Sequence, residues 1–253
     1  MLSGYNGKIL EPGRHIQRLG NSLSGLNISG FDPADTLEIS NRLIEANDLA
    51  SLDSIIYIQV TRGSAPRSHA IPSIKLTPTV YASAKQFDRP LKKQEGGVRV
   101  IFLEDERWAR CNIKSVSLLP NILAKQKAAD SGAEEAVLVR DCEITEGSSS
   151  SFAAVFSGTL TTHPESNRIL GSITRGIVID LCKRAGIAVE ERPVKKEELA
   201  YAEEMMIMST TKEIMPVTAY DAMTVSDGSP GKITIKLQGL FAEYIEKNVS
   251  NRT

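Results

Sequence analysis

The sequence of 253 residues contains little cysteine, histidine or tryptophan. Its three cysteines, Cys111, Cys142 and Cys182, are widely spaced and form no Cys-x-x-Cys pair. They predict neither a disulfide framework nor a zinc site, and we interpret them as buried or idle thiols. The three histidines are equally scattered along the chain, so we expect no metal centre.

The sequence also lacks an excess of charge of either sign and any long apolar run. Its 30 Lys and Arg residues oppose 31 Asp and Glu residues, and a net charge of −1 provides no global field to attract nucleic acid or an anionic membrane. No stretch approaches the roughly 18 uninterrupted apolar residues of a membrane helix, and the N-terminus does not resemble a secretion signal. We therefore expect a cytoplasmic protein that binds a small charged metabolite through local cations.

Helical and strand patterns alternate along the chain, which is typical of a mixed α/β fold. A polar stretch at residues 85–97, with a proline and paired glycines, interrupts them and indicates a domain boundary. We predict a smaller first domain at 1–88, a linker at 89–97 and a larger second domain at 98–253. The expected helices cover residues 32–44, 122–131, 173–185 and 233–245, and the expected strands cover 54–61, 76–84, 98–103, 135–139, 152–156 and 158–162.

Two residues carry the strongest chemical signal. Lys114 lies in the stretch 107–120, and Glu146 follows 32 residues later, just before Gly-Ser-Ser-Ser-Ser. Pyridoxal 5'-phosphate needs a lysine to hold its aldehyde and an acid to keep its ring nitrogen protonated. Burial would help the lysine to lose its proton and attack the aldehyde. Taken singly, the lysine is more typical of a solvated surface and the glutamate of a turn or a helix cap.

In context, the chain resembles the D-amino-acid aminotransferases of the class IV aminotransferase family. The similarity begins near Tyr5-Asn-Gly7 and continues to the last expected helix. Its blocks cover residues 56–63, 66–69, 107–120, 144–152, 169–175 and 209–211. The resemblance implies the two-domain class IV fold, with pyridoxal 5'-phosphate bound by the larger C-terminal domain.

The sequence departs from the family pattern in two places. Family members begin earlier, with opening strands and a tyrosine beside the cofactor's phenolic oxygen, so we expect a truncated N-terminal domain. Missing strands would expose a sheet edge and reduce stability and activity. In addition, Ser151 replaces the asparagine that usually follows the serine run, although the serine hydroxyl still forms hydrogen bonds.

The resemblance also assigns the cofactor-binding residues. It implies that Thr174 and the backbone at Ile173 bind the phosphate at a helix N-terminus, where unpaired N–H groups favour anions. Arg18 would supply a cation and Thr210 a hydroxyl, while Leu170 would pack on the pyridine face opposite the lysine. From the residues alone, Thr174 is more typical of a helix cap, Arg18 of a solvated helix face and Leu170 of a core.

Arg67 and His69 follow an expected strand and a Gly-Ser-Ala-Pro turn. In extended backbone, side chains two residues apart point the same way, and arginine binds a carboxylate through a planar pair of donors. The resemblance implies that the two residues trap the substrate carboxylate in the neighbouring subunit of a homodimer. A polar loop that happens to contain both residues is the alternative.

The function implied is transfer of the amino group between D-alanine, or other D-amino acids, and 2-oxoglutarate, which yields pyruvate and D-glutamate. Lys114 would act as general base and acid, with ping-pong kinetics. Three alternatives stay open: an aminodeoxychorismate lyase, a branched-chain L-amino-acid aminotransferase, and a truncated member of the family that has lost activity.

Overall fold

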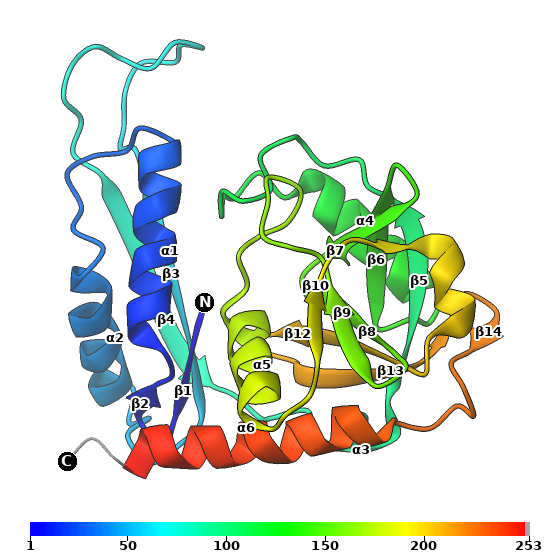
Figure 1. The fold of residues 1–253 in the computed structure, drawn as a ribbon. Helices are drawn as coiled ribbons and strands as arrows, with labels where there is room; N and C mark the ends of the chain where they lie inside the picture. The colour runs from blue at the N-terminus through cyan, green and yellow to red at the C-terminus, as the bar shows by residue number, and fades with distance from the viewer. Residues whose placement is uncertain (251–253) are drawn as a thin grey trace. The chain divides into compact units, whose positions relative to one another are not determined.

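A computed structural model describes residues 1–250, which form two compact units (Figure 1). The first unit contains Met1–Asp88 and residues 248–250, and the second contains Arg89–Lys247. The predicted linker at 89–97 carries a short helix, α3 (Leu91–Gly96). Arg89 donates two hydrogen bonds to the Glu213 carboxylate, at 2.7 and 2.8 Å, so this segment is anchored on the second unit.

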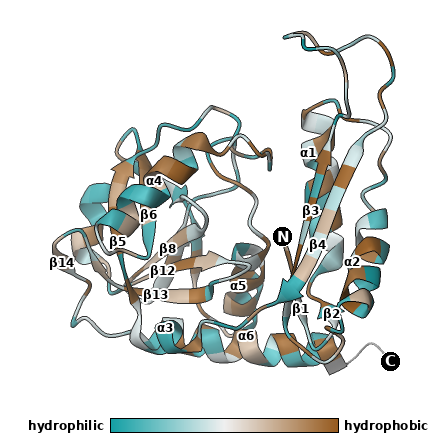
Figure 2. Ribbon diagram, turned by 180° about the vertical axis from the view of Figure 1, so that it is seen from behind, coloured by the Kyte–Doolittle hydropathy of each residue, from teal (hydrophilic) through white to brown (hydrophobic). Residues whose placement is uncertain are grey.

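The first unit is a four-stranded antiparallel sheet in the order β2-β1-β3-β4, and two helices cover one of its faces (Figures 1 and 2). Apolar side chains from both layers, such as Leu2, Ile44 and Ile56, form its core. The elements are β1 (Leu2–Tyr5), β2 (Lys8–Ile9), α1 (Pro12–Gly25), α2 (Asp35–Ala46), β3 (Ser54–Thr61) and β4 (Thr79–Gln86).

A long exposed connection, residues 62–78, joins β3 to β4. At its base Gly63 has φ 102°, and a Cβ at this position would collide with the carbonyl of Thr77. Only glycine adopts this conformation without strain, so Gly63 lets the two ends of the connection approach each other. The strand predicted at 76–84 begins later, at Thr79, and Pro78 directly before it has no N–H to donate to a sheet.

The second unit is built on a ten-stranded mixed sheet. Its main order is β10-β9-β8-β12-β13-β5-β6-β7-β11, with β14 paired to β13. The strands are β5 (Val98–Glu104), β6 (Glu135–Arg140), β7 (Glu143–Gly147), β8 (Ser151–Phe156), β9 (Thr159–Thr162), β10 (Val189–Glu191), β11 (Val194–Lys195), β12 (Glu204–Ser209), β13 (Glu213–Tyr220) and β14 (Met223–Thr224).

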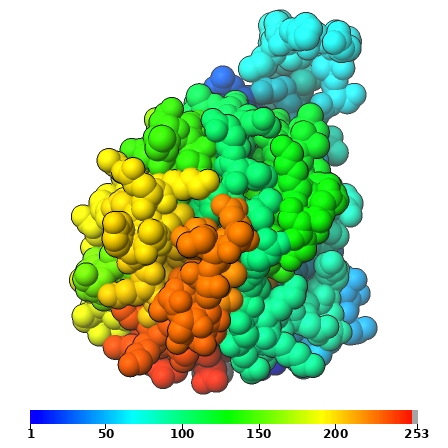
Figure 3. Space-filling view, turned by 90° about the vertical axis from the view of Figure 1, so that its right-hand side faces the viewer, coloured from blue at the N-terminus to red at the C-terminus, as the bar shows by residue number. Residues whose placement is uncertain are grey.

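Helices of the second unit complete the fold. They are α3, α4 (Leu119–Asp130), α5 (Ile173–Arg184), the 3-10 helix η1 (Lys196–Tyr201) and α6 (Lys232–Ser250), which belongs to this unit up to Lys247. Small residues on α4, including Ala124 and Ala128, pack against Ala136 and Leu138 of β6. Figure 2 shows the apolar character of β12. In Figure 3 the segments that contain η1 (yellow) and β14 (orange) lie on the face turned toward the viewer.

Most of the predicted elements are present. The expected strand at 54–61 is β3, and the expected helices near 122–131 and 173–185 are α4 and α5. The sequence patterns did not predict β12 and β13, whose residues are all buried or half-buried. Strands buried on both faces show no polar alternation, so the period that marks a half-exposed strand is absent. Within residues 1–250, none of the helices combines the length and the apolar character needed to cross a bilayer.

A buried carboxylate caps the N-terminus of α6. Glu204 accepts the N–H groups of Ile233 and Thr234, both at 2.8 Å, and the Thr234 hydroxyl at 2.6 Å. A Cβ at Gly231 would collide with this carboxylate. The negative charge satisfies unpaired backbone donors and faces the positive end of the helix dipole.

Replacing Glu204 with alanine should therefore destabilise the second unit. We expect Glu204→Ala to lower the free energy of unfolding by about 2 kcal/mol, because two helix N–H groups and a hydroxyl lose a charged acceptor. Urea denaturation followed by circular dichroism measures the change. Glu243→Ala, at an exposed position of α6, should change stability by less than about 0.5 kcal/mol. Equal effects of the two substitutions would contradict the capping role.

Candidate cofactor site in the second unit

The loop between β5 and α4 carries Lys114. The loop is tied to the segment that precedes α5: the Cys111 N–H donates to the Asn167 carbonyl, and the Asn167 side chain donates to the Ala109 carbonyl, both at 2.9 Å. The Lys114 side chain is exposed, so the burial that we expected to help it lose a proton is not supplied by this chain alone.

Glu146 lies on β7, and its side chain is only 7% exposed. Its Oε1 atom accepts a short hydrogen bond from Nη1 of Arg107 and another from the N–H of Leu170, at 3.0 Å. Within residues 1–250, no donor is bonded to its Oε2 atom. A buried carboxylate therefore has one oxygen fixed by the protein and one available to a ligand.

Arg107 is held in place by a buried network. Its Nε and Nη2 atoms donate to the two oxygens of Asp105, at 2.8 and 2.9 Å, and Nη2 also contacts the Thr145 hydroxyl and the Arg168 carbonyl. The Asp105 side chain is fully buried, and Arg140 lies 3.2 Å from it. Since arginine is a rigid planar donor, these contacts fix the direction from which Nη1 approaches Glu146.

The buried charges shift each other's proton affinity. Burial raises the pKa of Glu146 to about 7, while the Arg107 guanidinium and the Leu170 N–H act in the opposite direction. For Asp105 the balance is reversed. Burial alone would raise its pKa, but hydrogen bonds and charge from Arg107, with the Thr145 hydroxyl, outweigh burial and lower the pKa. The guanidinium thus favours the ionised form of both carboxyl groups.

The N-terminus of α5 directly follows the segment that contacts Glu146. Ser172 caps the helix by accepting the Arg175 N–H, so Thr174 is not the cap that the residues alone suggested. Within residues 1–250, the N–H groups of Ile173 and Thr174 and the Thr174 hydroxyl have no hydrogen-bond partner. Unpaired donors at a helix N-terminus are suited to bind a phosphate.

The structure brings only part of the predicted site together. Glu146 accepts the Leu170 N–H, and α5 begins three residues after Leu170. The Leu170 side chain is half-buried. Thr210 lies in the turn between β12 and β13 of the same unit. The other three predicted residues belong to the first unit: Arg18 is half-buried on α1, and Arg67 and His69 are exposed in the connection 62–78.

The sequence reading missed the Arg107 network. Arg107 begins the stretch in which we noted Lys114, but it gave no signal of its own, because its partner Glu146 is 39 residues away. The spacing Asp105-x-Arg107, with Thr145 next to Glu146, is the sequence pattern that could have indicated the network.

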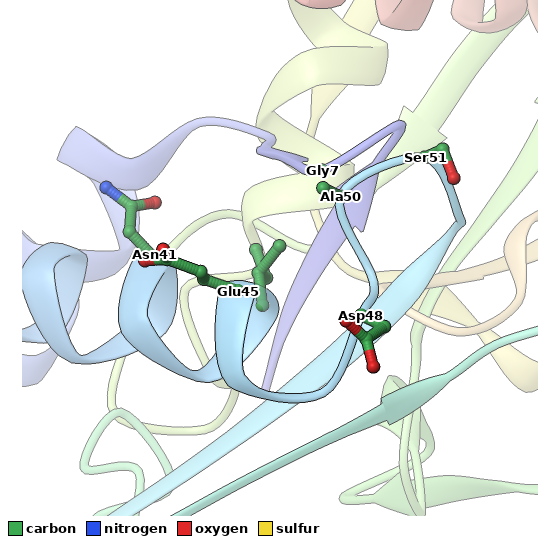
Figure 4. Close-up of a pocket in the computed structure, with 7 residues that line it drawn as sticks. Gly7, Asn41, Glu45, Asp48, Ala50 and Ser51 are labelled. Carbon is green, nitrogen blue, oxygen red and sulfur yellow. The ribbon is translucent and has the colours of Figure 1, made fainter.

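A separate pocket of about 430 Å³ lies in the first unit (Figure 4). It is lined by residues of α2 and of the turns at 6–7 and 47–51, among them Asn41, Glu45 and Ser51. None of the predicted site residues lines it. Among residues 1–250 there is also no cluster of three or more His, Cys, Asp or Glu residues able to hold a metal ion.

Comparison with known proteins identifies close relatives. The family model for class IV amino-transferases matches residues 1–220. The D-alanine aminotransferase of Bacillus licheniformis is 41% identical over 235 residues, which cover 92% of this chain and 82% of the relative. The D-alanine aminotransferase of Staphylococcus aureus strain MSSA476 is 37% identical over 245 residues, which cover 96% and 86%.

Solved structures share the fold. The branched-chain amino acid aminotransferase of Escherichia coli matches with a TM-score of 0.88 at 22% identity, covering 96% of this chain and 84% of that chain. The pyridoxal phosphate form of the branched-chain aminotransferase of Thermobaculum terrenum gives 0.86 at 23% identity, covering 98% and 84%. A putative 4-amino-4-deoxychorismate lyase of Legionella pneumophila gives 0.83 at 22% identity, covering 96% and 88%.

The buried network predicts a pH-dependent stability effect. We expect Asp105→Asn to lower the free energy of unfolding by about 3–5 kcal/mol at pH 7, because Arg107 and Arg140 lose a buried counter-charge. A carboxyl group whose pKa is lowered by folding stabilises the folded state above its unfolded pKa, and that stabilisation is lost as the pH falls. The difference between wild type and variant should therefore shrink below about pH 4.

Urea denaturation between pH 7 and pH 3 measures this difference. Asp130→Asn, at an exposed position at the end of α4, is the matched control and should have little effect. A difference for Asp105→Asn that stays below about 1 kcal/mol, or that does not change with pH, would show that the network does not depend on this charge.

Proposed function

This chain belongs to the class IV aminotransferase family, and we propose that it is a D-amino-acid transaminase that uses pyridoxal 5'-phosphate. The main support comes from Glu146, a buried carboxylate. Its Oε1 atom accepts hydrogen bonds from Arg107 and Leu170, and within residues 1–250 no donor is bonded to its Oε2 atom. A protonated pyridine nitrogen is a suitable donor for the second oxygen.

The other predicted residues fit the same cofactor. The unpaired N–H groups at Ile173 and Thr174, with the hydroxyls of Thr174 and Thr210, would hold the phosphate, and Arg18 would add a positive charge. Leu170 would pack on one face of the ring, so that reaction takes place on the other face. When bound, pyridoxal phosphate withdraws electrons and stabilises negative charge on the α-carbon of the substrate.

Lys114 would hold the cofactor covalently and, once released by the substrate, carry a proton between the substrate α-carbon and C4' of the cofactor. Glu146 would keep the proton on the ring nitrogen during this transfer, and the Arg107 guanidinium would favour the ionised form of Glu146. Water would supply the oxygen of the 2-oxo acid that leaves, the amino group would stay on the cofactor, and a second 2-oxo acid would then take up that amino group and release the water. The two half-reactions predict ping-pong kinetics.

The substrate class follows from the relatives and from the connection 62–78. The two D-alanine aminotransferases, at 41% and 37% identity, support D-alanine as the amino donor and pyruvate as the product. The guanidinium of Arg67 and the imidazole of His69, both exposed, would bind the substrate carboxylate. 2-Oxoglutarate, converted to D-glutamate, is the proposed acceptor.

We also propose that the protein is a cytoplasmic homodimer. Large apolar side chains before and after Lys114 are 45–66% exposed, which is unusual for so many neighbouring positions in a monomer. A second copy of the chain would bury them and also bring its Arg67 and His69 to this site. The residues concerned are Trp108, Val116, Leu118, Leu119, Ile122 and Leu123.

The cofactor assignment predicts a covalent bond at one lysine. With pyridoxal phosphate, the wild-type protein should be yellow, and borohydride should bleach it and add the mass of the cofactor to the peptide containing Lys114. Lys114→Ala should not take up the label. It should also form pyruvate from D-alanine and 2-oxoglutarate at least about 1,000-fold more slowly. Lys127→Ala, on the exposed face of α4, is the control and should retain both.

The same assay separates the family's activities. D-Alanine should yield pyruvate, whereas L-leucine should yield little oxo acid and aminodeoxychorismate no pyruvate. Reaction with L-leucine alone would indicate a branched-chain aminotransferase, and a wild-type protein that stays colourless with pyridoxal phosphate would contradict the proposal as a whole.

The carboxylate trap predicts an effect on KM. Arg67→Leu should raise the KM for D-alanine by about tenfold or more, because a charged hydrogen bond to the carboxylate is lost in the ground state and the transition state alike. The kcat should change little. Lys75→Ala removes a cation from an exposed position of the same connection and should leave both constants near wild type. If Lys75→Ala raised the KM as much as Arg67→Leu did, Arg67 would contribute only positive charge, which would contradict a direct contact with the substrate carboxylate.

A further inference from the structure

Glu135, the first residue of β6, is a fully buried carboxylate that has no place in the mechanism above. Three consecutive serines donate to it: Ser148 through a short hydrogen bond, Ser149 at 2.7 Å and Ser150 at 3.2 Å. The backbone N–H of Ala136 adds a fourth, at 3.1 Å. Four donors on one buried carboxylate are the pattern of an ionised group that organises its surroundings.

The serine loop held by Glu135 directly follows Glu146 in the chain. Between them, Gly147 donates its N–H to the Ser150 carbonyl at 2.6 Å. A Cβ on Gly147 would collide with the Ser150 hydroxyl and would lie 3.2 Å from Cγ of Glu135. The turn at residues 147–150, directly after Glu146, therefore packs closely against Glu135.

Glu135 also reaches the turn that carries Thr210. The ammonium group of Lys212 lies 3.2 Å from the Glu135 carboxylate and 3.3 Å from the Ser149 hydroxyl, and its side chain is only 12% exposed. The Lys212 N–H donates to the Ser209 hydroxyl at 3.2 Å, which closes the turn around Thr210. One carboxylate is thus bonded to both segments.

We propose that Glu135 is a positioning residue that holds the serine loop 148–150 and the 209–212 turn in the arrangement that binds the cofactor phosphate. The inference rests on the proposed function and deepens it. A negative charge close to a phosphate would by itself weaken phosphate binding. Any contribution of Glu135 to the affinity for pyridoxal 5'-phosphate must therefore come through the side chains that it holds in place. A positioning role and a direct effect of its charge thus predict changes of opposite sign.

The sign of the effect of Glu135→Gln provides the test. Glutamine has the same size but no charge to hold Lys212, so the turn at Thr210 should loosen, and the Kd for pyridoxal 5'-phosphate should rise by about tenfold. The Kd for pyridoxal, which has no phosphate, should change less than about twofold. Absorbance titration of the apoprotein gives both constants. If Glu135 acted only through its charge, the Kd for pyridoxal phosphate would fall instead, and the inference would be overturned.

Two further variants provide the controls. Glu134→Gln removes the same charge from the preceding residue, whose carboxylate is 3.9 Å from Lys212, and should leave the ratio of the two Kd values unchanged. Lys212→Met should raise the Kd for pyridoxal phosphate, and combining it with Glu135→Gln should add little, because the two residues act through one contact. Additive effects would overturn the inference, and Lys212→Met still tests it if Glu135→Gln does not fold.

The outcomes also separate this inference from the proposed function. A wild-type protein that binds neither compound would overturn both. A wild-type protein that binds pyridoxal phosphate, with an unchanged Kd ratio in Glu135→Gln, would overturn only the role of Glu135. A loss of apoprotein stability in urea with unchanged Kd values would show that Glu135 only supports the fold.

Discussion

The proposed cofactor site depends on the buried ion pair between Arg107 and Glu146. It places a carboxylate, normally expelled to the surface, at the end of β7 with one oxygen fixed and one available. Desolvating two charges is costly, and the pair is tolerated because Asp105, Thr145 and backbone groups satisfy the remaining donors of Arg107. Burial and these hydrogen bonds fix the side chain of Glu146, whereas an exposed glutamate side chain would be mobile.

The network also sets the chemistry of the acid. A carboxyl group buried without a cation would be protonated near neutral pH and could not stabilise a positive ring nitrogen. Arg107 works against this effect on Glu146, and Asp105 in turn provides the counter-charge that keeps Arg107 oriented. Charges alternate from Arg140 through Asp105 and Arg107 to Glu146, and the ring nitrogen would extend this alternation by one step.

Sequence reasoning reached part of this arrangement. The apolar run 54–61 and the helix ended by Gly132 follow from local patterns. Lys114 and Glu146 were predicted from the chemistry of a single cofactor, and their roles belong to the proposed function. Arg107 and Glu135 did not emerge, because their roles come from partners brought together by the pairing of β6 with β5 and β7. The sequence also could not give the exposure of Lys114 in the single chain, since accessibility depends on how the whole surface is assembled.

Glu146 is proposed to keep a pyridine nitrogen protonated. The nitrogen-15 chemical shift of ring-labelled pyridoxal phosphate bound to the protein measures this state directly. We predict the shift of a protonated ring in the wild-type protein at neutral pH and that of an unprotonated ring in Glu146→Gln. An unprotonated ring in the wild type, or a shift that does not depend on the side chain at position 146, would contradict it.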